Sequence, residues 1–361
     1  MSRAKKIFFV AAHRPDRSPS QRYRFEQYFS ILTNNGFEYT LAYLINKEDD
    51  IRFYGPYSPL LKLLLLLKFF LMRVKHVWQS RRYDFIFIQR EAYFIGGPFF
   101  ERLFKIWGKP LIFDFDDAIW LPNVSQENAK WGFLKYPQKT SKIISICDKV
   151  ICGNAYLEEY AKQFNQNTIL IPSTIDLSYY QIDRSLREPG VVCIGWSGSG
   201  TTVPYFDEIT PALIRLKEEF GDRIKFVVYG DPNYRNEALG IEGIRWSPDT
   251  EVHVINSFDI GIMPIPDTEW AKGKCSMKGL QYMALGITTV MSAVGTNKVV
   301  ITPGENGELC SDLDTWYVKL KQLIESETLR NQLGAAGKLT VEKEYSSRAQ
   351  SKAFLELFSL S

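Results

Sequence analysis

Short apolar runs alternate with helical patterns along the whole chain, and this alternation is the feature that most constrains the fold. It is typical of parallel sheets wound by crossover helices, because strands buried on both faces are apolar throughout. The runs predict two series of strands. The first series comprises Ile7–Ala12, Thr40–Tyr43, Asp84–Ile88, Pro110–Asp114, Lys149–Gly153 and Thr168–Ile171. The second series comprises Val191–Trp196, Lys225–Gly230, Asp259–Pro264, Thr288–Ser292 and Gly307–Cys310.

Two series of strands predict two domains, and the length of 361 residues suits two cores better than one. We expect an α/β fold with a Rossmann-like domain over residues 1–175, a polar linker over 176–190 and a second Rossmann-like domain over 191–361. The last helix is expected to pack back on the first domain. Ligands of such sheets bind outside the carboxyl ends of the strands, so two facing domains would form a cleft there.

Composition and cysteine usage indicate a globular protein of a reducing compartment. Hydrophobic residues make up 45% of the chain and charged residues 24%, as in a fully folded protein. The apolar stretch that ends at Ala12 is too short for a signal-peptide core and fits a buried first strand. The five cysteines form an odd set without zinc-knuckle spacing, so neither a disulfide framework nor a metal site is suggested. We expect a cytoplasmic protein.

The positive charge is concentrated in the first part of the chain. The net charge is +3, but residues 1–110 hold 19 lysines and arginines against 9 acidic residues. This excess predicts an anionic partner on that side, either a phosphate-bearing substrate or a membrane surface, and a solvated basic face is the alternative. No nucleic acid is expected as a partner, because no recognised reader motif accompanies the charge.

One segment, Leu60–Arg82, is unusually apolar and bordered by cations. Lysines interrupt it, so no stretch approaches the roughly 20 residues of a membrane span. On a helical wheel, one broad arc holds Leu63, Leu64, Leu66, Leu67, Phe70, Leu71 and Val74, and Lys62, Lys68, Arg73 and Lys75 bound the other arc. Such a helix fits an anionic membrane surface, which would make the protein peripheral on the cytoplasmic face. A core-facing crossover helix is the equal alternative.

The segment from Asp259 to Gly307 carries the clearest chemical signal. A strand ends at Met263-Pro264, a lysine-containing loop follows, and a helix is predicted to open near Ser276 and end near Gly286. A helix N-terminus offers free N–H groups and a positive dipole. We therefore expect a pyrophosphate site here, formed by Lys274, Ser276 and Lys278.

A small-residue loop, Ser197 to Thr202, directly follows the first strand of the second domain. Small residues let the backbone approach a phosphate closely, so Gly198 and Ser199 are further donor-binding candidates. A tight turn between strand and helix is the alternative. The nearby lysines favour the binding interpretation.

Charged residues also follow three predicted strands of the first domain. Asp114 falls within or at the end of a strand, and Asp116 and Asp117 follow it as catalytic candidates. Arg90 and Glu91 follow an earlier strand and could bind a phosphate or orient a hydroxyl; a surface salt bridge between them is the alternative. Glu91 is the third catalytic candidate. The candidates for the acceptor or phosphate side are His13, Arg22, Arg24 and Arg90.

The stretch Gln281 to Val290, QYMALGITTV, resembles the Glu-Ala-Met-Ala-x-Gly-x-Pro-Val-Val signature of the family-4-like retaining glycosyltransferases. Residues 148–154, 171–176 and 304–307 resemble other pieces of that family in the same order. The resemblance implies the GT-B fold, two Rossmann-like domains facing each other across a cleft. It also implies hexose transfer from a nucleotide-diphosphate sugar to a glycan or lipid-linked acceptor, with retention of configuration. No obligatory cofactor or metal is implied.

The chain departs from the family pattern at one pair of positions. Members usually carry two glutamates separated by seven residues, where this chain has Gly273 and Gln281. The resemblance implies that Gln281 could still hydrogen-bond a donor ribose, whereas Gly273 cannot orient the sugar. It also implies that Asp116 and Asp117, which together with Trp120 match an Asp-Asp-x-x-Trp motif, contact the sugar or the acceptor.

Two other functions remain open. A catalytically inactive nucleotide-sugar-binding or scaffold protein would account for the missing glutamates. A metal-dependent phosphohydrolase or GT-A transferase would use the Asp114-x-Asp116 motif. Against the phosphohydrolase, Ala118 stands where its motif needs Thr or Val. Against a GT-A enzyme, a single Rossmann-like domain leaves the second series of strands unexplained.

Overall fold

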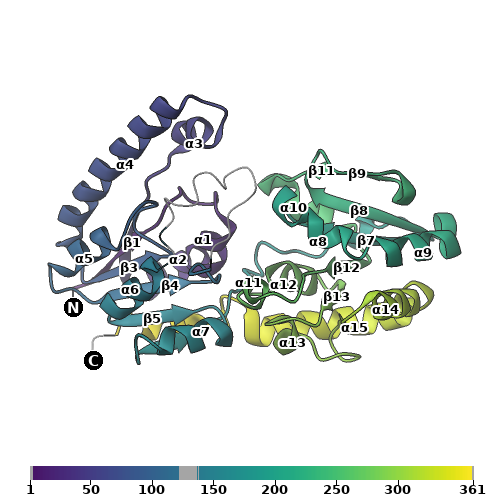
Figure 1. The fold of residues 1–361 in the computed structure, drawn as a ribbon. Coiled ribbons are helices and arrows are strands. Elements are labelled where there is room, and N and C mark those ends of the chain that lie inside the picture. The colour runs from purple at the N-terminus through teal and green to yellow at the C-terminus, as the bar shows by residue number, and fades with distance from the viewer. Residues whose placement is uncertain (1–2, 122–135, 137, 360–361) are drawn as a thin grey trace. The chain divides into compact units, whose positions relative to one another are not determined.

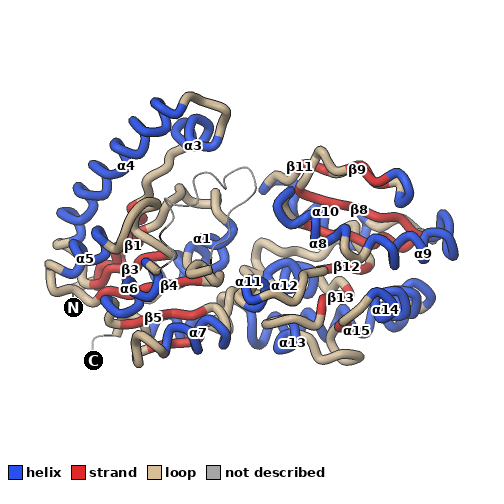
Figure 2. The backbone as a smooth tube through the Cα atoms, in the orientation of Figure 1, coloured by secondary structure: helices blue, strands red, loops and turns tan. Residues whose placement is uncertain are grey.

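The computed structural model describes residues 3–121, 136 and 138–359. The chain divides into two compact units, Met1–Ser173 with Ser351–Ser361, and Thr174–Gln350. Each unit is built on a six-stranded sheet with helices packed against it, as the ribbon and tube views show (Figures 1 and 2). The predicted α/β class is confirmed.

The first unit contains a parallel sheet with strand order β2-β1-β3-β4-β5-β6. Every residue of β3 and β4 is buried, as expected for strands covered on both faces. The six predicted strands are confirmed, with their ends shifted by at most three residues. Their bounds are β1 Lys5–Val10, β2 Phe37–Ala42, β3 Phe85–Gln89, β4 Leu111–Phe115, β5 Lys149–Cys152 and β6 Thr168–Leu170.

The last helix of the chain belongs to the first unit. Phe354 of this helix stacks on Tyr28 with ring centroids 4.0 Å apart, and Phe358 lies in the same core cluster. The Nζ atoms of Lys5 and Lys149 donate to the carbonyls of Phe358 and Leu357. The helices of this unit are α1 Pro19–Arg24, η1 Glu26–Tyr28, α2 Phe29–Asn34, α3 Lys47–Tyr54, α4 Pro59–Ser80, α5 Phe99–Lys105, α6 Lys139–Ile146, α7 Ala155–Lys162 and α16 Ser351–Glu356.

The second unit has a parallel sheet with strand order β11-β8-β7-β12-β13-β14. The five predicted strands are confirmed. Three strands of two residues each were not predicted, because they are too short to form an apolar run. The bounds are β7 Val192–Ser197, β8 Ile224–Gly230, β9 Arg235–Asn236, β10 Ile241–Glu242, β11 Ile244–Arg245, β12 Ile260–Met263, β13 Thr288–Ser292 and β14 Glu308–Cys310.

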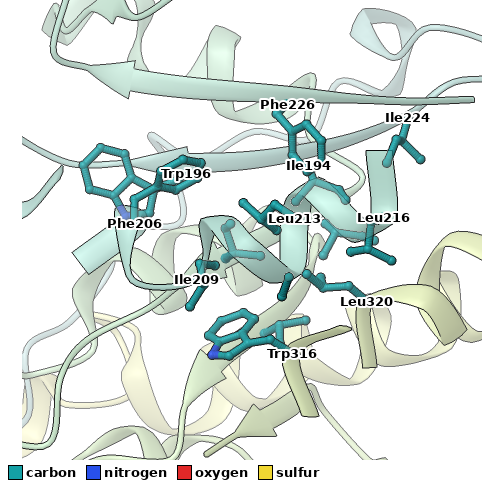
Figure 3. Close-up of a cluster of buried hydrophobic side chains, with 14 of the residues drawn as sticks. Ile194, Trp196, Phe206, Ile209, Leu213, Leu216, Ile224, Phe226, Trp316 and Leu320 are labelled. Atoms are coloured by element: carbon teal, nitrogen blue, oxygen red, sulfur yellow. The ribbon is translucent and has the colours of Figure 1, made fainter. Parts of the chain in front are cut away.

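Aromatic and aliphatic side chains fill the core of the second unit, with Trp196, Phe206 and Leu213 grouped above Trp316 and Leu320 (Figure 3). Helix α12 packs so closely on β12 that a Cβ at Gly261 would lie 2.4 Å from the Tyr282 ring. The helices are η3 Arg184–Leu186, η4 Gly200–Thr202, α8 Val203–Asp207, α9 Thr210–Phe220, η5 Gly221–Arg223, η6 Glu237–Leu239, α10 Pro248–Asn256, α11 Glu269–Lys272, α12 Met277–Ala284, α13 Asn297–Val300, α14 Leu313–Glu325, α15 Glu327–Thr340 and the π-helix Val341–Tyr345.

Helix α4 packs on the first unit through a narrow face formed by Leu65, Phe69, Arg73 and Val77. Arg73 is fully buried, and its guanidinium donates to the carbonyls of Ala11 and Ala42, at 2.9 Å each. The expectation that Arg73 bounds the exposed cationic arc of the helix is therefore wrong, because its guanidinium is held inside the unit by these two carbonyls. No helix within the described ranges is both long and apolar enough to cross a membrane.

Candidate functional site

The loop after β7 in the second unit has a geometry that only glycine allows at position 198. A Cβ there would lie 2.3 Å from the Trp196 ring and 2.7 Å from Nζ of Lys278. The Gly198 N–H donates to the carbonyl of Tyr229, and the Ser197 N–H donates to the hydroxyl of Tyr282. The loop is thus held in place by the sheet and by α12. Its first residues follow the carboxyl end of a parallel strand, where open α/β sheets bind ligands.

Lys278, in the first turn of α12, reaches this loop. Its Nζ donates to Oγ1 of Thr202 at 3.2 Å and lies 4.6 Å from the centre of the Trp196 ring. Burial and the positive charge of Lys274 lower the pKa of Lys278 to about 7. No carboxylate of the described ranges forms an ion pair with it. An anion placed at this ammonium would supply the missing counter-charge.

Lys274 lies in the loop that leads into α12, with its Nζ 5.0 Å from the centre of the Trp270 ring. Its charge acts on Lys278. The predicted grouping of Lys274, Lys278, Gly198 and Ser199 is therefore compatible with the structure. Two neighbouring ammonium groups beside a glycine loop suit a ligand with more than one negative charge.

Two other predicted donor contacts are buried. The Ser276 hydroxyl donates to Oδ1 of Asn297 at 2.7 Å, and its backbone is left-handed with φ 56°. Ser276 thus shapes the turn into α12, and its side chain does not cap the helix. Nε2 of Gln281 donates to the Tyr180 hydroxyl at 2.7 Å. Both side chains are buried and hydrogen-bonded within the unit, and their contact with a donor stays a prediction.

In the first unit, Arg90 connects the two predicted catalytic aspartates. Its Nε donates to Oδ1 of Asp116 at 2.9 Å, and its guanidinium also forms an ion pair with Asp117. Ser20 donates to the other oxygen of Asp116 at 2.6 Å, and Gln89 donates to Ser20. The cluster joins the ends of β3 and β4 to α1. Ser20 and Gln89 extend the group that was predicted from these strand ends.

Backbone strain and charge both single out Arg90. Its φ of 60° lies in the left-handed region, which is uncommon for residues other than glycine and recurs at functional sites. Burial opposes ionisation of Asp116, but Arg90, Arg24 and the Ser20 hydrogen bond hold the pKa of Asp116 below its ordinary value. Asp116 is therefore a carboxylate at neutral pH, and it can accept a hydrogen bond from a hydroxyl.

Arg24 and Asp114 form a separate buried pair. Both side chains are 1% exposed, and Nη2 of Arg24 lies 2.5 Å from Oδ1 of Asp114. Nη1 of Arg24 donates to the carbonyl of Ile171. The prediction that Arg24 faces a ligand is wrong, because it neutralises the strand carboxylate. The phosphohydrolase interpretation loses its nucleophile for the same reason.

His13, a candidate for the acceptor or phosphate side, does not supply a positive charge there. Burial and the nearby charge of Arg17 lower the pKa of His13 to about 4, so the ring is neutral at pH 7. Arg22 is half-buried, and its guanidinium lies 4.7 Å from the centre of the Tyr23 ring. Glu91 accepts from Nζ of Lys139 at 3.2 Å. Arg90 forms ion pairs with the two aspartates. The alternative, a salt bridge between Arg90 and Glu91, does not form between these described residues.

Residues 189–326 match the family described as Glycosyl transferases group 1. No curated protein matches the chain by sequence at a significant level. Among solved structures, sucrose-phosphate synthase from Thermosynechococcus elongatus aligns with a TM-score of 0.71 at 15% identity, over 98% of both chains. HepE from Anabaena, in complex with UDP and glucose, aligns with a TM-score of 0.67 at 12% identity, over 99% of this chain and 100% of its own.

A UDP-forming α,α-trehalose-phosphate synthase from Burkholderia xenovorans aligns with a TM-score of 0.65 at 12% identity, over 99% of this chain and 98% of its own. At such low identities these likenesses establish the fold, and the fold is GT-B. The predicted fold family is confirmed.

Proposed function

We propose that the chain is a glycosyltransferase that moves a hexose from a nucleoside-diphosphate sugar to a glycan or lipid-linked acceptor, as supported by the match of residues 189–326 to the glycosyl transferases group 1 family. The observation that carries the proposal is Lys278, an ammonium group without a carboxylate partner in the described ranges, held against the loop of Gly198 and Thr202. A positively charged group beside a glycine loop suits the negative charge of a diphosphate.

The donor diphosphate is assigned to the second unit. Lys278 and Lys274 neutralise its charge, and the N–H groups in the first turn of α12 add the positive end of a helix dipole. These groups also stabilise the diphosphate as it leaves the sugar, when its negative charge grows. Since two ammonium groups can neutralise that charge, we propose that no metal ion is obligatory. Retention of configuration is proposed from the family resemblance.

The acceptor hydroxyl is assigned to the cluster in the first unit. Asp116 or Asp117 accepts its hydrogen bond, and Arg90 fixes both carboxylates. Ser20 already donates a hydrogen bond to one oxygen of Asp116. An acceptor hydroxyl that binds Asp116 is therefore a second hydroxyl donor to the same carboxylate. Glu91 is paired with Lys139 and has no assigned step.

The test is turnover of labelled UDP-, GDP- and ADP-hexoses by the purified chain, with and without a chelator. We expect release of one nucleoside diphosphate, undiminished by the chelator. Binding without turnover of any donor would instead identify an inactive nucleotide-sugar-binding protein, the alternative raised by Gly273. Turnover that disappears with the chelator would contradict the proposed metal independence.

A further inference from the structure

Helix α4 of the first unit exposes a long apolar face. Its members are 45% to 67% exposed, although large apolar side chains are normally covered, and they are Leu60, Leu63, Leu64, Leu67, Leu71, Val74 and Trp78. We call this set the leucine face. The helix runs along one side of the first unit, with α3 at one end and α5 near the other (Figure 1). The face opposite to it packs on the unit through Leu65 and Phe69.

The leucine face is a continuous stripe. From Leu60 to Trp78 most of its members follow one another at alternating intervals of four and three residues, which keeps them on one side of a helix. The stripe is about 27 Å long at 1.5 Å per residue. At one border, Phe70 packs against the exposed Phe99 of α5, with ring centroids 6.2 Å apart. An apolar patch of this extent marks an interaction site on a soluble unit.

The border of the face is cationic. Lys68, which forms an ion pair with Asp49 of α3, and Lys75 are exposed along one side, and Arg81 and Arg82 are exposed at the C-terminal end. The guanidinium of Arg81 lies 3.8 Å from the centre of the Trp78 ring. Helix α4 contains no acidic residue. Arg82 also lines a cavity of about 570 Å³ together with Arg3, Lys6, Glu38 and Tyr83.

We propose that the leucine face is a docking surface for an anionic phospholipid bilayer. The helix lies in the plane of the interface, with its leucines in the acyl boundary and its lysines and arginines at the headgroups. Trp78 with Arg81 is an aromatic and cationic pair of the kind enriched at that boundary. The protein is then peripheral on the cytoplasmic face of a membrane.

A second copy of the chain is the competing occupant, and charge argues against it. Two leucine faces packed together would bring the cations of one helix beside those of the other, and α4 has no acidic residue to pair with them. An anionic bilayer supplies the complementary charge instead. Docking does not depend on the proposed glycosyl transfer. A lipid-linked acceptor follows only if both proposals hold.

The experiment is co-sedimentation of the full chain with vesicles of phosphatidylcholine alone and of phosphatidylcholine with 30% phosphatidylglycerol. We expect at least tenfold stronger partitioning to the anionic vesicles, weakened but not abolished by salt, because the apolar contribution is not screened. The variant Leu67→Gln/Leu71→Gln should lose at least tenfold of this partitioning. The variant Lys75→Gln/Arg81→Gln/Arg82→Gln should lose the preference for the anionic lipid. Arg73 is left unchanged because it is buried.

The matched control is Val299→Gln/Leu339→Gln, which removes two apolar side chains of similar exposure from the second unit and should sediment like the wild type. Circular dichroism checks that each variant is folded. Wild type that stays in the supernatant with both lipids overturns the proposal. So does concentration-dependent dimerisation in the ultracentrifuge that Leu67→Gln/Leu71→Gln abolishes, since the face would then belong to a second copy. Turnover of the donor measured without vesicles reports on the glycosyl transfer separately.

Discussion

At the scale of single residues, Lys278 links the sequence signal to a measurable property. It was predicted from its place near a helix start, and the fold presses it against Trp196 and the loop of Gly198. We predict that Lys278→Ala weakens binding of the matching nucleoside diphosphate by about 10- to 100-fold, as expected for a lost hydrogen bond to a charged group. Isothermal titration calorimetry measures it. The exposed Lys298→Ala is the control, and equal affinities in both variants would remove the site.

The lowered pKa of Lys278 gives a second prediction. In the free protein the pKa is about 7, and a bound diphosphate raises it, because the charged form is then favoured. Affinity is therefore constant below pH 7 and falls as the pH rises above 7, by up to about tenfold per pH unit. Titrations from pH 6.5 to 9 in the wild type should show this decline, and Lys278→Ala should flatten it. A decline of the same slope in Lys278→Ala would assign the proton to another group.

The three aspartates near the end of β4 are predicted to behave differently. Asp116 and Asp117 both form ion pairs with Arg90, so Asp116→Asn and Asp117→Asn test the proposed acceptor site. We expect turnover in at least one of them to fall about 100-fold or more, with donor affinity within a factor of about three of the wild type. Steady-state kinetics and calorimetry together measure this. Wild-type turnover in both would make them structural.

Asp114→Asn tests stability instead of activity. The substitution leaves the Arg24 guanidinium buried without its carboxylate, and breaking a buried pair costs about 3–5 kcal/mol. We expect the free energy of unfolding of the first unit to fall by this amount in urea titrations followed by fluorescence. Glu38→Gln, which removes an exposed partner of Lys6, is the control and should change it by less than about 1 kcal/mol.

At the scale of elements, the sequence predicted what depends on local pattern. All eleven apolar runs became strands, because a strand buried on both faces must be apolar along its length. The positions of the loops after β4 and β7 were predicted correctly, because the end of an apolar run marks the carboxyl end of its strand. The two-residue strands β9, β10 and β11 lack such a run and could not be predicted.

What the pattern could not decide is which polar groups find partners far along the chain. The helical wheel of α4 did not predict its buried face, which contains Leu65 and Phe69 together with Arg73, whose guanidinium donates to the carbonyls of Ala11 and Ala42. The Ser276 hydroxyl donates a hydrogen bond to Asn297, and the Gln281 amide donates one to Tyr180. Each partner lies at least 21 residues away in sequence, beyond the range of local pattern. Burial and the positive charge of Arg17 together lower the pKa of His13 to about 4 and leave its ring neutral.

At the scale of the whole molecule, the chain leaves the first unit at Ser173 and returns to it at Ser351. The core of the first unit is therefore incomplete until the last residues arrive. Phe354 and Phe358 contribute to the cluster that contains Phe9, Phe25 and Phe87. During synthesis, the first unit cannot close its core before the second unit has been made. The two units are linked in folding by the order of the chain.

We therefore predict that Phe354→Ala destabilises the first unit selectively. Phe354 is 1% exposed and stacks on Tyr28, so truncation removes apolar burial and leaves a cavity, which costs about 3–5 kcal/mol for phenylalanine. In a urea titration followed by hydrogen exchange, protection of β1 and β3 should fall by that amount, and protection of β7 and β12 should stay unchanged. Leu339→Ala, which truncates an exposed side chain, is the control. Equal loss of protection in both sheets would mean that the units unfold together. In that case, the return of the chain at Ser351 couples the two cores in stability as well as in order of folding.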